Sequence, residues 1–331
     1  MKYDTCMDKP LLSICIPTYN RAHYLQGCLE SIVCQFDDEA VRNLVEVVIS
    51  DNASEDNTGD LVKGYQKRFD NIKYFRNETN VLFDPNVVNS IEKASGVYCW
   101  YMGDDDAIRN GGIKAIVDFL DKNRVAVMTV DTVPFVALED IIEHRVILNL
   151  DTFRTFASFY DFFRKGNVAG VLSVFIFDRN LWLSNVDKNN YILGWLYYEV
   201  ILKMLPKVNK KLVYCNYPVV YTKQNCDWVL GGTELIAFLN CKQLSDKMME
   251  FGYDKKVIGT AFNVSPMRLI VMLLRAKGHD LECSVKNLFL IYRQFSANVA
   301  FLPLITFIFF IPNGVIKLVR DFNKKVTKIK I

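Results

Sequence analysis

Short apolar runs alternate with amphipathic helical stretches along the first 130 residues of this chain. The runs at 11–16, 44–49, 72–75, 97–102 and 125–130 read as buried strands. Between them, apolar residues recur at helical spacing, as Leu25, Leu29 and Ile32 do after the first strand. Strands that alternate with helices favour parallel pairing, so the pattern predicts an α/β fold with a doubly wound, mainly parallel, Rossmann-like sheet.

Polar clusters follow the first, second and fourth expected strands, at residues 17–20, 50–52 and 103–106. In a doubly wound sheet, ligands bind outside the carboxyl ends of the strands, near the point where the strand order reverses. Solvated turns would be scattered over both ends of the sheet. We therefore expect the three clusters to form one shared site.

The most informative cluster is the acidic triplet Asp104-Asp105-Asp106, directly after the fourth strand. Carboxylates at a strand end are ligands for a hard divalent cation such as Mg²⁺ or Mn²⁺, and the cation could bind a diphosphate. An acidic triplet by itself is more often a solvated turn, so the other two clusters are needed for this interpretation.

Four segments form a set: Ile16-Pro17-Thr18-Tyr19-Asn20-Arg21, residues 50–56 (SDNASED), Ala94-Ser95-Gly96 and Gly103 to Asp106. Taken together, they resemble the nucleotide-sugar-binding half of family 2 glycosyltransferases of the GT-A fold. The resemblance covers roughly residues 10–120. The layout is most similar to bacterial O-antigen sugar transferases, including those that add abequose and other dideoxyhexoses.

The resemblance implies roles for individual residues at the nucleotide. Pro17 and Thr18 would present backbone groups to the base, and Asp51 would accept a hydrogen bond from a base N–H. A carboxylate suits that role because it only accepts, and charge-assisted bonds are strong. Asn20 and Arg21, which follow the first strand, complete the donor-binding set. The alternative for Asp51 is a turn or helix-capping aspartate.

The resemblance also implies that Asp104 and Asp106, as a D-x-D pair, hold ribose and a Mn²⁺ or Mg²⁺ ion. Asp106 is expected as the direct metal ligand and Asp105 as the residue that orients the sugar. Lys223 would add positive charge near the diphosphate, while Gln224 beside it can only hydrogen-bond. Trp228 and Gly231-Gly232 could form a flap over the sugar, or an ordinary loop.

The catalytic base is harder to assign. Inverting relatives carry an aspartate from a Glu-Asp pair where this chain has Leu196-Tyr197. Glu199 is the nearest substitute as base, and its alternative is a partly buried structural glutamate. A transferase that retains the anomeric configuration needs no such base, because the leaving phosphate oxygen can take the proton.

The C-terminal region combines apolar and basic sequence. Residues 299–311 are apolar except for Thr306, but this run is shorter than the ~20 residues that span a bilayer. Residues 313–331 contain six basic residues and one acidic residue, which gives this segment a net charge of +5. Because the whole chain has a net charge of +3, the remaining residues have a net charge of −2. This composition favours an interfacial helix on anionic lipid over a core helix with a basic face.

We expect three regions: a donor-binding half at 1–130, an acceptor-binding half at 131–232, and a helical, membrane-associating region at 233–331. Nine cysteines without a C-x-x-C pair favour a reducing compartment. The sequence thus predicts a metal-dependent glycosyltransferase on the inner, cytoplasmic face of the cell membrane. It would move a sugar from a nucleoside diphosphate to a saccharide acceptor, linked to a lipid such as undecaprenyl diphosphate, in O-antigen synthesis.

Three other functions are alternatives to this one. A membrane-docked nucleotide-sugar-binding subunit without activity would explain the missing base. A nucleotidyltransferase would carry a Gly-rich phosphate loop where this chain has Pro17-Thr18-Tyr19-Asn20-Arg21. A nucleic-acid binder is disfavoured because the cations of the tail alternate with aliphatic residues.

Overall fold

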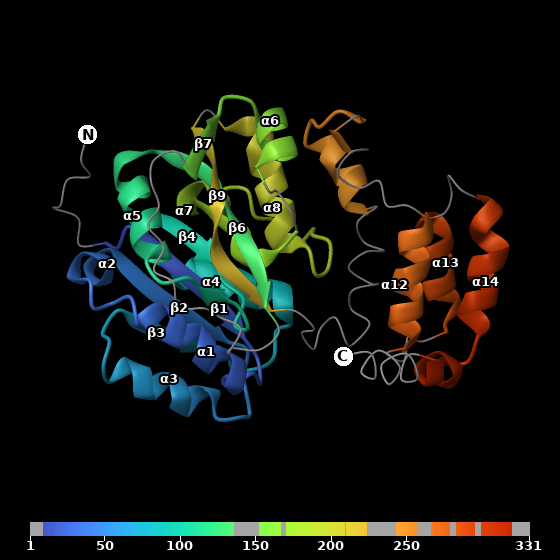
Figure 1. The fold of residues 1–331 in the computed structure, drawn as a ribbon, viewed down its shortest axis with the longest axis horizontal. Coiled ribbons are helices and arrows are strands. Elements are labelled where there is room, and N and C mark those ends of the chain that lie inside the picture. The colour runs from blue at the N-terminus through green and yellow to red at the C-terminus, as the bar shows by residue number, and fades with distance from the viewer. Residues whose placement is uncertain are drawn as a thin grey trace, which may run out of the picture. The chain divides into compact units, whose positions relative to one another are not determined.

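The computed structural model describes residues 9–135, 152–166, 170–208, 210–223, 243–255, 257–258, 266–278, 283–294 and 299–319. The chain forms two compact units, residues 1–224 and residues 225–331 (Figure 1). The predicted division near residue 130 separates functions inside the first unit, and like the boundary near residue 232 it stays a prediction.

The first half of unit 1 is the predicted parallel sheet. Its strands are β1 (Leu12–Thr18), β2 (Val45–Asp51), β3 (Ile72–Arg76) and β4 (Tyr98–Tyr101). They lie in the order β3-β2-β1-β4, and all three neighbouring pairs are parallel. Strand order reverses at β1, which has β2 on one side and β4 on the other. All four strands were predicted from their apolar runs.

The second half of the sheet is mixed. Its strands are β5 (Ala107–Ile108), β6 (Val125–Phe135), β7 (Phe153–Phe156), β8 (Phe175–Asp178) and β9 (Lys211–Lys223). Strand β8 lies between β4 and β6 and is antiparallel to both, while β9 runs parallel to β6 and antiparallel to β5 and β7. The sheet is therefore mainly parallel around the three polar clusters and antiparallel beyond them.

Helices of unit 1 fall into two groups. They are α1 (Ala22–Val33), α2 (Glu39–Leu44), α3 (Thr58–Gln66), α4 (Phe83–Lys93), α5 (Gly112–Lys122), α6 (Phe159–Lys165), α7 (Arg179–Leu183) and α8 (Leu196–Met204), with short 3-10 turns at Leu172–Val174 and Leu205–Lys207. Helix α1 packs on α3 and α2 on α5, whereas α8 packs on both α4 and α7. This division is the one a doubly wound sheet requires, with helices on both faces.

The helical stripes predicted from the sequence face the core. Leu25, Leu29 and Ile32 of α1 are completely buried, in one cluster with side chains of β1, β2 and α5. Val87 and Ile91 of α4 are also completely buried. Periodicity identified these helices correctly because each has a single apolar face.

Gly96 joins three strands at the amino edge of the sheet. Its N–H donates to Ser13 Oγ at 2.9 Å, and Ser13 Oγ donates to the buried Glu46 at 2.6 Å. A Cβ on Gly96 would lie 2.5 Å from Ser13 Oγ and 2.9 Å from the Ser13 nitrogen. The Ala94-Ser95-Gly96 motif therefore fixes the start of β4 against β1 and β2, at the edge opposite the acidic triplet.

Unit 2 contains the helices α12 (Pro266–Gly278), α13 (Val285–Gln294) and α14 (Leu302–Phe310), preceded by the 3-10 turn Val299–Phe301. They pack around a core that includes Leu273, Ile291 and Ile305. Within the described residues, no single helix is long and apolar enough to cross a membrane. By length and composition alone, 299–310 together with 313–319 would pass, but the pair bends by 92°.

Candidate active site

The three polar clusters meet at the carboxyl edge of the parallel strands. Thr18 lies beside Asp51 in the register of β1 and β2, and Pro17 lies beside Ser50. The N–H of Asn52 donates to the carbonyl of Thr18 at 2.9 Å, which ties the second cluster to the first. Strand β4 ends one residue before Met102, so Asp104 follows at the same edge. The prediction of one shared edge is confirmed.

Asp104 and Asp105 are held by residues of the first cluster. The hydroxyl of Thr18 donates to Asp104 Oδ2 at 2.8 Å. The guanidinium of Arg21 lies 3.0 Å from Asp104 Oδ1 through Nε, and it donates to Asp105 Oδ2 at 2.5 Å. Residues that are 84 and 86 positions apart in the sequence thus form one ion-paired group.

Asp106 is held by residues from much later in the chain. Ser173 Oγ donates to Asp106 Oδ2 at 2.5 Å and accepts from the Gly103 N–H at 2.8 Å. The backbone N–H of Lys223, at the end of β9, donates to Asp106 Oδ1 at 2.9 Å. The Lys223 ammonium lies 5.1 Å from the centre of the Phe135 ring. Lys223 therefore reaches the triplet through its backbone.

Burial raises the pKa of Asp104 to about 7, although the nearby Arg21 cation and the Thr18 bond act in the opposite direction. Burial also raises the pKa of Asp106 to about 7, and the negative charge of Asp105 adds to the rise, while the Ser173 and Lys223 bonds oppose it. The cause is common to both: carboxylates gathered out of water disfavour their ionised forms. A divalent cation would relieve this repulsion.

The chemistry of these side chains fits a magnesium or manganese ion. Such ions prefer carboxylate oxygens, and two nearly buried carboxylates with raised pKa values offer them. All four carboxylate oxygens of Asp104 and Asp106 also contact protein donors. Each oxygen has a second lone pair that can serve a metal. Within the part of the chain that the structure describes, no three His, Cys, Asp or Glu side chains already converge as a metal centre.

Asp51 is completely buried at the end of β2 and has three polar neighbours. Its Oδ1 accepts from the Ser54 N–H at 2.9 Å, the turn contact that the alternative interpretation expected. Its Oδ2 accepts from the Tyr74 hydroxyl at 2.5 Å and lies 3.7 Å from Arg76 Nε. Burial and the bond to Asp51 both raise the pKa of Tyr74. Asp51 therefore orders its own turn and also anchors two side chains of β3.

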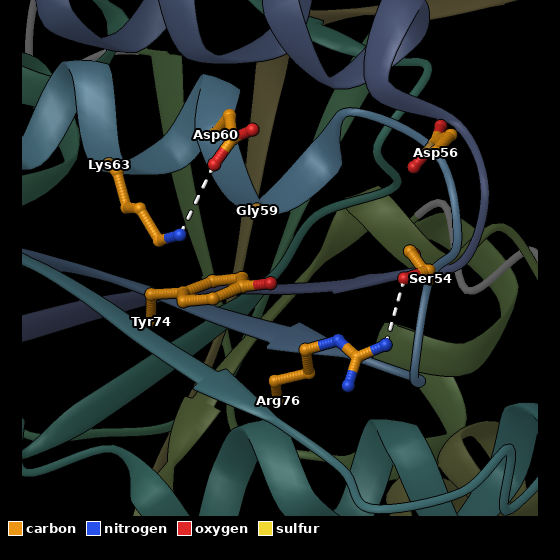
Figure 2. Close-up of a pocket in the computed structure, with 7 residues that line it drawn as sticks. All are labelled: Ser54, Asp56, Gly59, Asp60, Lys63, Tyr74 and Arg76. Carbon is orange, nitrogen blue, oxygen red and sulfur yellow. Dashed lines mark hydrogen bonds and ion pairs between the residues drawn. The ribbon is translucent and has the colours of Figure 1, made fainter.

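Tyr74 and Arg76 border a pocket of about 240 Å³. Its lining offers polar and apolar surface in similar amounts and consists of Ser54, Asp56, Gly59, Asp60, Lys63, Tyr74 and Arg76. Figure 2 shows the Tyr74 ring between the Asp60–Lys63 pair and Arg76, whose guanidinium donates to the Ser54 carbonyl at 2.9 Å. A pocket with an aromatic ring and both charges suits a polar, planar group.

Asn20 connects this pocket region to the first cluster. It has a left-handed backbone, with φ 53°, a conformation that asparagine tolerates better than most residues. Its N–H donates to Ser54 Oγ at 2.8 Å, and its side-chain oxygen accepts from the Glu55 N–H at 2.7 Å. The N–H of Ala22, the first residue of α1, is capped by Asp56 at 3.0 Å. The SDNASED segment is thus fastened to the start of α1.

Glu199 belongs to a third group, on α8. It is 7% exposed, and its Oε2 accepts from the Ile192 N–H at 3.1 Å. The buried Asp84 of α4 accepts from the N–H groups of Gly194 and Leu196, at 2.6 and 3.1 Å. Burial raises the pKa of Asp84 to about 6, and the Glu199 charge adds to the rise. Glu199 therefore orders the segment before α8, as the structural alternative expected, and its role as a base stays a prediction.

Sequence reasoning missed several residues of the site. Ser173 carries no local signal, because it reaches Asp106 only through the antiparallel insertion of β8. Tyr74 and Arg76 lie in or directly after a strand that was predicted, and their alternation with Phe75 could have placed both on one face. Gln224, Trp228 and Gly231-Gly232 lie outside the described residues.

Comparison with known proteins gives three results. The sequence model "Glycosyl transferase family 2" matches residues 13–180. The abequosyltransferase RfbV of Salmonella typhimurium is 39% identical over 113 residues, which are 34% of this chain and 33% of RfbV. The Campylobacter jejuni GalNAc(5)-diNAcBac-PP-undecaprenol beta-1,3-glucosyltransferase is 35% identical over 111 residues, which are 33% of this chain and 34% of that enzyme. The matched region thus spans about a third of each relative's length.

Solved structures share the fold at low sequence identity. Staphylococcus aureus TarS 1-349 in complex with UDP aligns over 88% of this chain and 87% of its own, with a TM-score of 0.52 at 16% identity. The mannosyltransferase PcManGT of Pyrobaculum calidifontis, in complex with GDP-Man and Mn²⁺, aligns over 94% and 87%, with a TM-score of 0.53 at 15% identity. The predicted GT-A-like fold is confirmed.

Proposed function

Because the chain belongs to glycosyl transferase family 2, we propose that it is a metal-dependent glycosyltransferase that moves a sugar from a nucleoside diphosphate to a saccharide acceptor. The observation that carries the proposal is the hydrogen-bonded group of Thr18, Arg21 and the Asp104–Asp106 triplet at the carboxyl edge of β1 and β4. The pocket beside Asp51 lies at the end of the neighbouring strands.

The donor nucleotide would bind along this edge. Its base enters the pocket that Tyr74 and Arg76 line, close to Asp51, with Pro17 and Thr18 offering backbone groups. Both oxygens of Asp51 already have protein partners, so a base N–H would share an oxygen with Tyr74 or the Ser54 N–H. Asp104 would take the ribose and Asp105 the sugar.

The diphosphate needs positive charge nearby, because it gains a further negative charge when its bond to the sugar breaks. Asp104 and Asp106 would hold a Mn²⁺ or Mg²⁺ ion, which supplies that charge when bound. Arg21 bridges Asp104 and Asp105 and keeps these carboxylates oriented for the donor. Ser173 and the Lys223 N–H do the same for Asp106.

The acceptor hydroxyl must lose a proton during the transfer, and two routes fit this chain. In an inverting reaction Glu199 would take the proton, after moving from its contact with the Ile192 N–H. In a retaining reaction the leaving phosphate oxygen takes it, and Glu199 stays structural. The Glu199→Gln variant separates the routes: it abolishes turnover in the first and leaves the rate within a few-fold in the second.

We place the acceptor on a lipid in O-antigen-type synthesis at the inner face of the cell membrane. One relative's name includes PP-undecaprenol, and another is an abequosyltransferase. Unit 2 has exposed apolar side chains on consecutive helical segments: Leu304, Phe307, Phe310, Val315, Leu318 and Val319 are 45–73% exposed. Basic residues follow in the sequence, although those from Arg320 onward lie outside the described residues. Apolar and basic surface together suit an anionic membrane.

Transfer can be tested by incubating the protein with Mn²⁺, labelled nucleotide sugars and undecaprenyl-diphosphate-linked saccharides, then following label into the lipid fraction. We expect one donor to give product, and Asp104→Asn to reduce the rate at least about a hundredfold. Asp118→Asn is the matched control on the exposed face of α5. If the wild-type protein binds nucleotide sugar but turns over no donor and acceptor pair, it is instead an inactive binding subunit.

Membrane association can be tested separately by flotation with vesicles in which one third of the lipid is anionic. We expect wild-type protein to float and the Phe307→Ser, Phe310→Ser double variant to stay at the bottom. Each substitution removes a phenylalanine ring whose burial in the membrane would favour binding. Flotation of both proteins to the same extent would contradict this part of the proposal and leave the transfer reaction unaffected.

A further inference from the structure

Lys277 is a buried basic residue of unit 2. It lies in the last turn of α12 and is completely buried, among the helices that form the core of this unit. Its Nζ donates to the Phe309 carbonyl at 2.6 Å and to Cys283 Sγ at 3.2 Å, and it lies 5.5 Å from the centre of the Phe309 ring. Among the described residues, no carboxylate forms an ion pair with it.

One of these contacts has a structural explanation. The Phe309 carbonyl lies in the last turn of α14, where carbonyl groups have no partner within the helix. A lysine at that place caps the helix and favours its negative end. The contact with Cys283 is not needed for this role, because the amine already has the carbonyl.

The second contact places a nucleophilic nitrogen beside an accessible sulfur. Cys283 lies just before α13, is exposed and forms no disulfide, so small oxidants in solution can reach its thiol. Its Sγ also donates to the Phe309 carbonyl at 3.2 Å. Because Nζ and Sγ share this acceptor, they are held on the same side of it, six positions apart in the chain. Little movement is needed to bring them to bonding distance.

We propose that Lys277 and Cys283 are a modification site, which hydrogen peroxide converts into a covalent lysine–cysteine crosslink. In the first step the sulfur attacks peroxide, an S–O bond forms, the O–O bond breaks, and water leaves the sulfenic acid behind. In the second step the Lys277 ammonium gives a proton to water, and Nζ, now the free amine, attacks that sulfur. An N–S bond forms, the S–O bond breaks, and the departing hydroxide takes a proton from the nitrogen.

The overall reaction consumes one thiol, one amine and one peroxide, and it yields a sulfenamide and two waters. Sulfur is oxidised and peroxide is reduced. Sulfenic acids condense with nitrogen in this way when one is held close, and thiols reverse the product. The crosslink would tie the end of α12 to the start of α13. It is independent of the proposed transfer reaction.

The test is peptide mapping of the full-length protein after treatment with hydrogen peroxide and alkylation of the remaining thiols. We expect a peptide in which Lys277 is joined to Cys283, about 2 Da lighter than the reduced form because two hydrogens are lost. Dithiothreitol should release it. Cys34, an exposed thiol at the end of α1 that contacts the Ser31 carbonyl, is the matched control in the same sample and should carry no lysine link.

Two variants complete the experiment. Lys277→Arg keeps the positive charge but removes the primary amine, so the linked peptide should disappear while Cys283 is still oxidised. Cys283→Ser should remove it as well. The proposal is overturned if wild-type Cys283 becomes a sulfinic acid or a disulfide while Lys277 stays unmodified. Because the wild-type map alone decides this, the test does not depend on the folding of the variants.

Discussion

Ser173→Ala is the most informative change to the site, because this hydroxyl both donates to Asp106 and accepts from the Gly103 N–H. Ser173 is completely buried, so water cannot replace either bond. A hydrogen bond to a charged group contributes about 1.5–3 kcal/mol, and an unsatisfied buried N–H costs about 1–3 kcal/mol. We expect the free energy of unfolding of the variant to fall by about 2–4 kcal/mol.

The same change should weaken the binding of nucleotide with Mn²⁺, since Asp106 loses the bond that orients it. About 1.4 kcal/mol of lost orientation corresponds to a tenfold rise in Kd. Calorimetric titration of the nucleoside diphosphate that binds wild-type protein best measures this directly. Ser184→Ala, at the exposed end of α7, is the control and should leave Kd unchanged. A folded Ser173→Ala variant with wild-type Kd would refute the idea that Ser173 positions Asp106 for the donor.

Three further predictions concern other parts of unit 1. The pKa of buried Asp84, raised to about 6, lies above its unfolded value, so this group adds stability as pH falls from 8 to 4. The free energy of unfolding, measured with urea, should therefore shift by about 2 kcal/mol in favour of wild type over Asp84→Asn across this range. An unchanged difference between the two proteins would contradict the raised pKa. Gly96→Ala should destabilise the protein by about 1–3 kcal/mol because the added Cβ has no room. Gly64→Ala, in helix α3, is the control: its Cβ would meet nothing within 4 Å, and it should stabilise the protein by about 0.5–1 kcal/mol. Equal shifts in the melting temperature would show that the backbone around Gly96 moves to accept the Cβ. Arg76→Ala should raise the nucleotide Kd about tenfold, because Arg76 lines the pocket. Arg68→Ala, on the exposed surface, is the control and should leave Kd unchanged. Equal affinities of the two variants would show that the pocket is not part of the donor site.

The first half of the fold could be predicted from sequence because its information is local. Apart from α2 and β5, each strand and helix of residues 11–130 has one apolar run or stripe, and consecutive elements pack beside each other. The carboxyl edge follows from this order, so Thr18, Asp51 and Asp104 could be placed together without a structure. The Arg21 bridge could not, because the first-strand motif gave it only a general donor-binding role.

The strands after β6 could not be predicted, because their pairing joins segments that lie far apart in the sequence. Strand β8 pairs with β4, whose residues lie 76–80 positions earlier, and its short run Phe175–Asp178 has no alternation that reveals its antiparallel direction. Ser173 enters the site only through this insertion. Glu199 illustrates a different limit: a buried structural glutamate was the alternative to a base, but its bond to the Ile192 N–H depends on a turn that begins seven residues earlier.

The central claim is that the triplet binds a nucleotide through a divalent cation. It is tested most directly by titrating the protein with UDP, CDP, GDP and dTDP, each with and without Mn²⁺, and repeating the tightest case with Asp106→Asn. The account predicts that one nucleotide binds strongly only with Mn²⁺, and that Asp106→Asn weakens this binding at least about a hundredfold. Binding that is equally tight without the metal, or unchanged in the variant, would contradict it.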